Sequence, residues 1–248
     1  MAEVAQIEAL ASALCGPAGV SFAVQAIRSA NELDALAWDA AHYLQGTERE
    51  WFTSLRSNKR RAEFCAGRIA ARRLMMQPPF EFALSSFEIE RTPCGAPRLR
   101  FGEESQKRAP HLSITHSAGF AVIVAATFPV GIDLEQVEPR PDSFIQYFLC
   151  DAEKGQAAGL TCEQRQLAIN RFWSSKEAIS KVHGWGSRLP MQALDCTQER
   201  ITFSGRDFHC ASAFRAGFVA SLAYESYAAP QWPLASSLRP TTDMTKHG

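Results

Sequence analysis

The chain has 248 residues, of which 46% are apolar, and its 26 lysine and arginine residues balance 26 aspartate and glutamate residues. That apolar content is enough for a globular core in one domain or two modest ones. Zero net charge argues against a protein that binds nucleic acid or a membrane surface through an overall charge excess. The longest apolar run, residues 120–126, is too short to span a bilayer, and residues 1–19 lack the basic segment of a signal peptide. We therefore expect a soluble, cytoplasmic protein.

The first 128 residues predict helices mixed with short strands. A helix is expected over 3–14, ending at Gly16-Pro17, and a strand over 20–27. A densely charged helical segment covers 47–76 and is expected to break near Ser57-Asn58, because asparagine is a poor helix former and a good cap. Later strands are expected at 84–91, 111–115 and 120–128, with a turn at 93–97.

The rest of the chain repeats this mixture. A strand is expected at 130–134 and a helix, in about three pieces, over 143–182. Short strands are expected at 194–196, 200–203, 207–215 and 218–225. From residue 228 onward proline, serine and threonine dominate, so that segment has too little apolar content to fold alone.

These elements predict an α+β protein. It has two similar-sized halves, 1–128 and 129–227, each with a small antiparallel sheet and helices, and a loose tail, 228–248.

Two carboxylates occupy alternate positions of the strand expected at 130–134 and just after it. Asp133 and Glu135 point to one face of an extended chain, whereas Ile132 and Leu134 point to the other. Two like charges held together are costly unless a cation lies between them, and carboxylate oxygens suit magnesium. The alternative is that both side chains form the solvated face of an edge strand.

A stripe of functional side chains runs along the last predicted helix. Trp173, Glu177 and Lys181 are spaced four residues apart and so share one helix face. The alternative is that Glu177 and Lys181 form an ordinary surface ion pair, which contributes little to stability.

Two further groups could bind phosphate. A strand tip carries Thr115, His116 and Ser117, which offer hydroxyl, imidazole and backbone N–H groups, unless they are simply polar turn residues. Arg61, Arg68 and Arg72 share one face of the 47–76 helix, and guanidinium groups suit bidentate phosphate binding. The alternative is a solvated face paired with glutamates 48, 50 and 63.

Each of these signals is weak alone, but their order along the chain resembles the Sfp-type phosphopantetheinyl transferases, and in particular the branch that activates siderophore and secondary-metabolite synthetases. The resemblance rests on a set of short motifs read in chain order. They are 66–72, Thr115-His116-Ser117, Gly131-Ile132-Asp133-Leu134-Glu135, the span from Trp173 to Lys181, Gly184-Trp185-Gly186 and Leu189-Pro190. One position departs from the family pattern, because Ala96 stands where the family often has a basic residue. Arg98 is the nearest substitute.

The resemblance implies a pseudo-twofold pair of halves with coenzyme A bound in the cleft between them. It implies transfer of 4′-phosphopantetheine to a serine of an acyl or peptidyl carrier protein, with release of 3′,5′-ADP. Magnesium, or alternatively manganese, would be held by Asp133, Glu135 and Glu177. Glu177 or a water on the metal would be the base, and Lys181 would bind the pyrophosphate and assist the leaving group. Coenzyme A would also be bound by Arg61, Arg68, Thr115 and His116. The same resemblance implies a monomer, whereas the zero net charge and the short apolar runs argue against nucleic acid and membrane as partners.

Three other functions remain open from the sequence. One is another magnesium-dependent phosphotransfer enzyme or phosphohydrolase that uses the same acidic cluster without a protein acceptor. A second is a non-catalytic protein that binds coenzyme A or a carrier, which would not need the full set of Asp133, Glu135, Glu177 and Lys181. A third is a nucleic-acid binder that uses the arginines of 56–73, which the zero net charge and the lack of interleaved aromatic residues disfavour.

Overall fold

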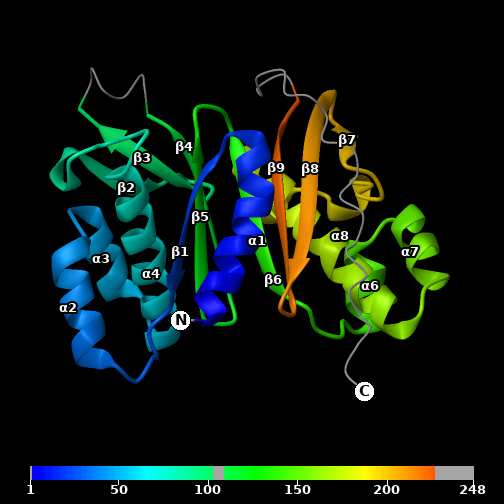
Figure 1. The fold of residues 1–248 in the computed structure, drawn as a ribbon, viewed down its shortest axis with the longest axis horizontal. Coiled ribbons are helices and arrows are strands. Elements are labelled where there is room, and N and C mark those ends of the chain that lie inside the picture. The colour runs from blue at the N-terminus through cyan, green and yellow to red at the C-terminus, as the bar shows by residue number, and fades with distance from the viewer. Residues whose placement is uncertain (1, 103–108, 227–248) are drawn as a thin grey trace.

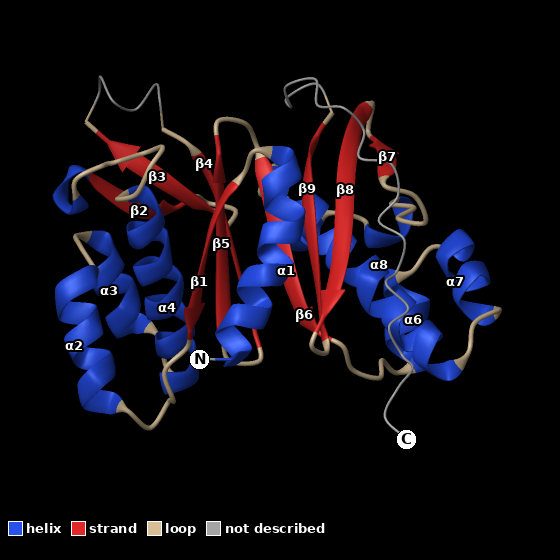
Figure 2. Ribbon diagram, viewed as in Figure 1, coloured by secondary structure: helices blue, strands red, loops and turns tan. Residues whose placement is uncertain are grey.

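The structure is a computed structural model, and it describes residues 2–102 and 109–226 (Figure 1). Strands fill the middle of the molecule and helices lie at both flanks (Figure 2). The predicted loose tail, 228–248, lies outside the described residues. Within the described residues, no helix is long and apolar enough to cross a membrane.

Among the described residues of the first half, five strands form two sheets. Its elements are α1 (Ala2–Ala18), β1 (Ser21–Ala26), α2 (Leu33–Tyr43), α3 (Thr47–Ser54), α4 (Asn58–Met75), η1 (Leu84–Ser86), β2 (Phe87–Arg91), β3 (Pro97–Phe101), β4 (His111–Ser117) and β5 (Phe120–Ala126). Strands β1, β5 and β4 form an antiparallel sheet in that order, and β2 and β3 form a separate hairpin. The buried face of α4 packs against β5 and the hairpin to form one apolar core.

The second half is built around a four-stranded antiparallel sheet. Its elements are β6 (Val130–Gln136), α6 (Asp142–Phe148), α7 (Asp151–Ala158), α8 (Cys162–Val182), η2 (Gly186–Arg188), η3 (Met191–Ala193), β7 (Arg200–Phe203), β8 (Arg206–Arg215) and β9 (Phe218–Glu225). The strand order is β6-β9-β8-β7. Helix α8 packs on β6 and β9, whereas α1 packs on β1 of the first sheet and on β8 and β9 of the second. Helix α1 therefore packs against both sheets and shares one apolar core with them, and Figure 1 shows it between the two sheets.

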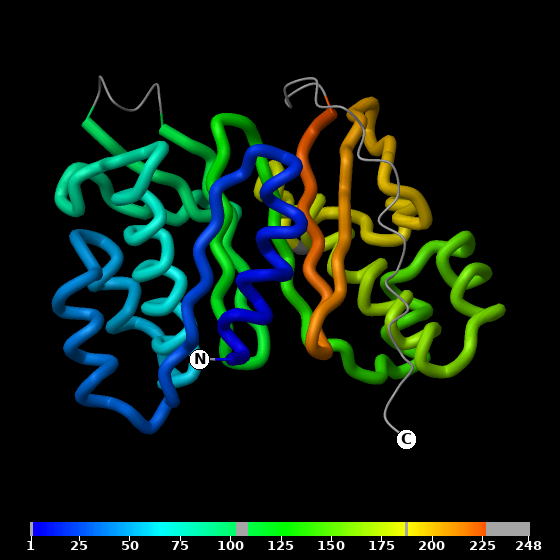
Figure 3. The backbone as a smooth tube through the Cα atoms, viewed as in Figure 1, coloured from blue at the N-terminus to red at the C-terminus, as the bar shows by residue number. Residues whose placement is uncertain are grey.

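The two sheets meet where β4 lies beside β6. The chain passes from one sheet to the other between β5 and β6, near the middle of the molecule (Figure 3). Hydroxyl groups on alternate residues of β4 accept hydrogen bonds from backbone N–H groups on alternate residues of β6. The pairs are Ser113 with Ile132, Thr115 with Leu134 and Ser117 with Gln136, at 3.1, 3.2 and 3.1 Å. Side-chain hydroxyls thus do at this junction what backbone carbonyls do inside a sheet.

The predicted α+β class is confirmed, and several predicted elements are confirmed with it. Helix 143–182 is indeed in three pieces, α6, α7 and α8. The break near Ser57-Asn58 is also present, because the Ser57 hydroxyl caps α4 by accepting a hydrogen bond from the N–H of Arg60 at 3.2 Å. The division at residue 128, the tail and the pseudo-twofold relation of the halves stay predictions.

Other predicted elements are wrong or incomplete. Residues 194–196 form no strand; they follow the short helix η3. Helix α1 runs on through Pro17 to Ala18 and ends at Gly19, whose φ of +63° allows the N–H of Val20 to bond the carbonyl of Cys15 at 3.0 Å. Proline in the last turn forfeits one backbone hydrogen bond without ending the helix there. Helix α2 and strand β3 were not predicted.

Candidate active site

A glycine lets α8 approach β6 closely enough to bring the functional residues of both elements together. A Cβ atom added to Gly131 would lie 1.9 Å from the carbonyl oxygen of Ala178. No side chain fits in that space, so the helix lies directly on the strand backbone at this point. Glu177 and Lys181, which flank Ala178 on the helix, are therefore held over Asp133.

Asp133 is buried and its two oxygens differ. Oδ1 accepts hydrogen bonds from the ammonium of Lys181 at 2.7 Å and from the hydroxyl of Thr115 at 3.2 Å. The same Lys181 ammonium donates to the carbonyl of Ile132 at 3.1 Å. Oδ2 is buried, and among the described residues it has no hydrogen-bond partner. A buried carboxylate oxygen left without a donor is costly, so this atom marks a place that a cation would satisfy.

Each carboxylate oxygen of Glu135 accepts one side-chain hydrogen bond. The indole N–H of Trp173 donates to Oε1 at 2.8 Å, and Arg140 donates to Oε2 at 2.9 Å. Arg140 is itself fixed by the side-chain oxygen of Asn170 at 3.0 Å. Burial raises the pKa of Glu135, and the neighbouring charge of Asp133 raises it further, although both donors oppose the shift. The predicted stripe on α8 thus does not point into solvent, since its Trp173 orients a carboxylate on β6.

Glu177 completes an acidic group. Its burial raises its pKa; Lys181 lowers it, while the charges of Asp133 and Glu135 raise it further. The three carboxylates are close enough to repel one another, although their oxygens do not all lie within 4.8 Å of one another. The structure therefore brings together the four residues predicted for metal binding and catalysis, Asp133, Glu135, Glu177 and Lys181.

A second acidic group elsewhere has a structural explanation. Within 2–102 and 109–226, Cys150, Glu153 and Asp195 offer ligand atoms that all lie within 4.8 Å of one another. Glu153 is fully buried and pairs with the equally buried Lys176 at 2.8 Å. It also caps α7 through the N–H of Cys150. Its charge is already neutralised, so we assign it to the core of the second half.

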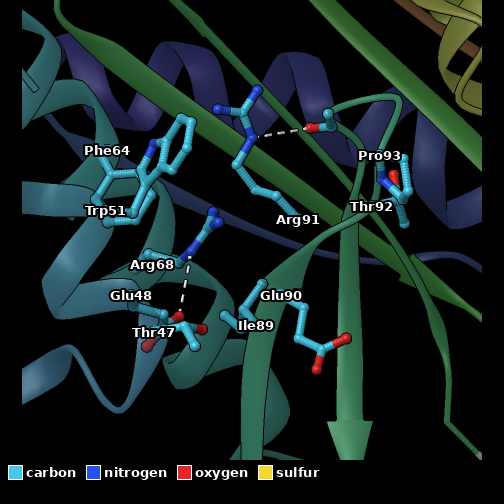
Figure 4. Close-up of a pocket in the computed structure, with 11 residues that line it drawn as sticks. Thr47, Glu48, Trp51, Phe64, Arg68, Ile89, Glu90, Arg91, Thr92 and Pro93 are labelled. Atoms are coloured by element: carbon cyan, nitrogen blue, oxygen red, sulfur yellow. Dashed lines mark hydrogen bonds and ion pairs between the residues drawn. The ribbon is translucent and has the colours of Figure 1, made fainter. Parts of the chain in front are cut away.

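The first half contributes two adjoining cavities. The larger, about 590 Å³, lies between α3, α4, the end of β2 and the following turn. The smaller, about 390 Å³, is lined by Arg60 and His116 among others. Four side chains line both cavities, namely Trp51, Phe64, Arg68 and Arg91. Figure 4 shows them around the larger cavity. Predicted residues Arg68 and His116 therefore lie at one hollow surface.

Arg68 is buried in the wall of both cavities. Its guanidinium pairs with Glu48 at 3.2 Å and lies 4.5 Å from the ring centroid of Phe64. Burial lowers its pKa to about 10, with Glu48 opposing the shift and the charges of Arg72 and Arg91 adding to it. Glu48 also pairs with Arg72, so one carboxylate serves two guanidinium groups.

The other predicted ligands of coenzyme A lie elsewhere. Arg61 donates to the carbonyl of Leu55 at 2.9 Å and to that of Thr53 at 3.4 Å, so it caps the end of α3 and lines neither cavity. Thr115 faces Asp133, as described above. Arg98 pairs with Glu90 at 2.9 Å and lines neither cavity. Direct roles of Arg61 and Thr115 in coenzyme A binding stay predictions.

Sequence reasoning missed two of the lining residues. Trp51 is 42% exposed on the short helix α3, which is an unusual degree of exposure for a large aromatic side chain. Arg91 is the last residue of β2. Side chains of a strand alternate between its two faces, so Arg91 lies on the face opposite to Glu90.

The comparison with known families concerns the half that holds the carboxylates. Residues 129–230 match the family model of the 4′-phosphopantetheinyl transferase superfamily. The resemblance predicted from the motifs is confirmed over this segment. It contains Asp133, Glu135, Glu177 and Lys181, the residues that the fold brings together.

Curated members of this superfamily show the same partial similarity. The chain is 28% identical over 84 residues to a 4′-phosphopantetheinyl transferase of Bacillus subtilis, covering 34% of this chain and 38% of the relative. It is 29% identical over 76 residues to 4′-phosphopantetheinyl transferase psf-1 of Bacillus pumilus, covering 31% and 33%. The chain thus matches 33–38% of the length of these relatives.

Solved structures with local similarity include a holo-(acyl-carrier-protein) synthase of Bacillus anthracis in complex with coenzyme A. It is 26% identical, has a TM-score of 0.33, and the match covers 42% of this chain and 94% of that one. A holo-[acyl-carrier-protein] synthase of Helicobacter pylori is 16% identical with a TM-score of 0.34, covering 43% and 97%.

Proposed function

We propose that this protein transfers the 4′-phosphopantetheine group of coenzyme A to a serine of a carrier protein and releases 3′,5′-ADP. The observation that carries the proposal is the unpartnered buried Oδ2 of Asp133, set among Glu135, Glu177 and Lys181 in the segment that matches the superfamily. Acyl and peptidyl carrier domains of secondary-metabolite synthetases are the proposed acceptors.

Asp133, Glu135 and Glu177 would hold a magnesium ion, with manganese as the alternative. Three hard oxygen ligands suit either ion, and the ion would supply the charge that Oδ2 of Asp133 lacks. It would also offset the burial and the repulsion from neighbouring carboxylates that raise the pKa values of Glu135 and Glu177. When bound, it would neutralise charge on the pyrophosphate.

Lys181 is placed to assist the leaving group. Its side chain is 27% exposed. Its ammonium could therefore move from Asp133 to a pyrophosphate oxygen without a rearrangement of the surrounding protein. The carrier serine oxygen attacks the phosphorus that bears pantetheine, and the bond from that phosphorus to 3′,5′-ADP breaks. Negative charge then builds on the leaving phosphate, where an ammonium stabilises it more than in the ground state.

Glu177 is placed to take the proton of the serine hydroxyl. A carboxylate whose pKa is raised by burial and by like charges is a stronger base than an ordinary glutamate. Asp133 and Glu135 already have donors in Lys181, Thr115, Trp173 and Arg140, whereas Glu177 has no side-chain hydrogen bond recorded among the described residues.

The cavities of the first half would receive the adenosine end of coenzyme A. Neighbouring residues of β4 support this, since Thr115 bonds Asp133 while His116 lines the smaller cavity. Because one chain supplies both the carboxylates and the cavities, we propose that the protein acts as a monomer.

The test is to incubate the protein with coenzyme A, magnesium and a panel of apo-carriers, and to weigh each carrier by mass spectrometry. We expect one carrier class to gain a single phosphopantetheine on serine. Asp133→Asn, which keeps the shape of the side chain, is expected to abolish the gain. Unchanged mass for every carrier in a broad panel would contradict the proposal.

A further inference from the structure

The hydroxyl of Thr115 on β4 makes two hydrogen bonds to neighbouring residues of β6. It accepts one from the N–H of Leu134 at 3.2 Å and donates one to Oδ1 of Asp133, also at 3.2 Å. A backbone N–H can only donate, and a carboxylate paired with an ammonium can only accept, so both directions are fixed. Thr115 is 4% exposed, so both bonds are made away from water, where they are stronger.

The neighbouring hydroxyls of β4 have a simpler role. Ser113 and Ser117 accept hydrogen bonds from the N–H groups of Ile132 and Gln136, each at 3.1 Å. Within the described part of the chain, neither serine hydroxyl is recorded as a donor to a carboxylate. All three hydroxyls therefore join β4 to β6, and the one on Thr115 also reaches Asp133. A β-branched threonine is stiffer at χ1 than serine, which suits a hydroxyl that must hold a second partner in place.

This second bond concerns the oxygen of Asp133 that faces away from the free one. Oδ1 takes the donors from Thr115 and Lys181, whereas Oδ2 is buried and has no partner among the described residues. The two donors differ in freedom. Lys181 is partly exposed and is proposed to move to the pyrophosphate, but the hydroxyl of Thr115 is tied to the N–H of Leu134. Thr115 is thus the donor that stays on Asp133 when Lys181 leaves.

We propose that Thr115 is a positioning residue for the metal ligand Asp133, and that it fixes this carboxylate so that Oδ2 is the oxygen that meets the ion. The inference rests on the proposed function, which assigns Asp133 to the ion. A hydrogen bond that orients a ligating carboxylate strengthens metal binding, because less freedom is lost when the ion binds. Thr115 lies in the first half and Asp133 in the second, so the affinity for the ion depends on the junction of β4 with β6.

The test measures binding of Mn²⁺ to metal-free protein by electron paramagnetic resonance, and stability by urea denaturation. Thr115→Val keeps the shape of the side chain and removes its hydroxyl. Thr115→Ala removes the same hydroxyl without adding a methyl group, and it is measured alongside in case the valine variant does not fold. Ser113→Ala is the matched control, because it also deprives a β6 N–H of its acceptor but leaves the bond to Asp133 intact.

We expect Thr115→Val to bind Mn²⁺ about tenfold to a hundredfold more weakly than the wild type. Ser113→Ala is expected to bind Mn²⁺ like the wild type, although both variants unfold at lower urea concentrations because each leaves a buried N–H without its acceptor. Thr115→Ser keeps both hydrogen bonds and is expected to retain most of the affinity. In the carrier assay, Thr115→Val is expected to need more magnesium for half of its maximal rate, whereas Ser113→Ala keeps the wild-type requirement.

Two results would overturn the inference and leave the proposed function in place. One is wild-type Mn²⁺ affinity in Thr115→Val and Thr115→Ala. The other is an equal loss of affinity in Ser113→Ala, which would reduce Thr115 to a residue that joins two strands. Asp133→Asn tests the proposed function separately. Mn²⁺ binding that Asp133→Asn leaves unchanged would overturn the assignment of the ion to these carboxylates.

Discussion

At the scale of single residues, Lys181 pairs with Asp133 and also has the proposed role in assisting the leaving group. Its contact with Asp133 is partly buried, so Lys181→Ala leaves an acidic side chain in the interior without its cation. We expect a loss of about 1–3 kcal/mol in unfolding free energy, together with a loss of about a hundredfold or more in turnover. Thermal denaturation and single-turnover kinetics measure the two effects.

A double variant separates the two roles. Lys181→Ala combined with Asp133→Asn removes both charges, so stability is expected to recover toward that of the wild type while turnover stays lost. A Lys181→Ala protein with wild-type turnover would reduce this contact to an ordinary ion pair.

The raised pKa of Glu177 predicts how stability depends on pH. A carboxyl group whose pKa is higher in the folded state than its ordinary value of 4.5 holds its proton more tightly when folded. Ionising it therefore costs the folded state stability as pH rises above that value, and the cost is complete above the folded pKa. Glu177→Gln removes the cost, so in EDTA it is expected to melt at a higher temperature than the wild type at pH 8 and at a similar temperature near pH 4.

Magnesium supplies the control for that comparison. Added ion is expected to raise the melting temperature of the wild type at pH 8 more than that of Glu177→Gln, because the variant has lost one ligand. Equal melting temperatures of the two proteins at pH 8 in EDTA would show that neither burial nor the neighbouring carboxylates make the ionised Glu177 costly to the folded state.

At the scale of elements, the close contact of α8 with β6 depends on Gly131. Gly131→Ala would place a methyl group 1.9 Å from the carbonyl oxygen of Ala178, so the helix must move away from the strand. We expect a loss of about 1–3 kcal/mol or more in unfolding free energy, as for other overpacked cores, and weaker magnesium binding. Gly155→Ala on α7 is the control, because nothing lies within 4 Å of its added Cβ and alanine favours a helix.

The sequence predicted those elements that have a strong local pattern and missed those that do not. The apolar strand β5 and the helix around Trp173 were recognised because their periodicity and motifs are contained within a few residues. Helix α2 was missed, although Leu36 and Ala40 lie on its buried side, because the charged Asp39, which pairs with Arg28, interrupts that side. Strand β3 alternates between exposed arginines and buried Leu99 and Phe101, a pattern that the sequence did offer.

At the scale of the whole molecule, the motifs predicted the carboxylate site but not the cavity beside it. Asp133 and Glu135 are neighbours in sequence, and Glu177 and Lys181 share one helix face, so each pair could be found from local spacing. The contact of Trp51 with Arg91 depends on how α3 packs beside the β2–β3 hairpin, which no local pattern reports. The role of α1 in joining both sheets is likewise a property of the assembled fold.

The monomer prediction also belongs to this scale. One chain supplies both the carboxylates and the cavities, so no second subunit is needed to complete the proposed site. Light scattering is expected to give the mass of one 27.3 kDa chain. A stable trimer would contradict the proposal that each chain acts alone.

In the proposed reaction, the carboxylate site transfers a group to a protein rather than to water. The most direct measurement is the amount of 3′,5′-ADP released from coenzyme A, quantified by chromatography with and without an apo-carrier that becomes modified. We predict release in a one-to-one ratio with modified carrier, and none when the carrier is omitted or its acceptor serine is replaced by alanine. Release of 3′,5′-ADP at the same rate without any carrier would identify a hydrolase and contradict the account.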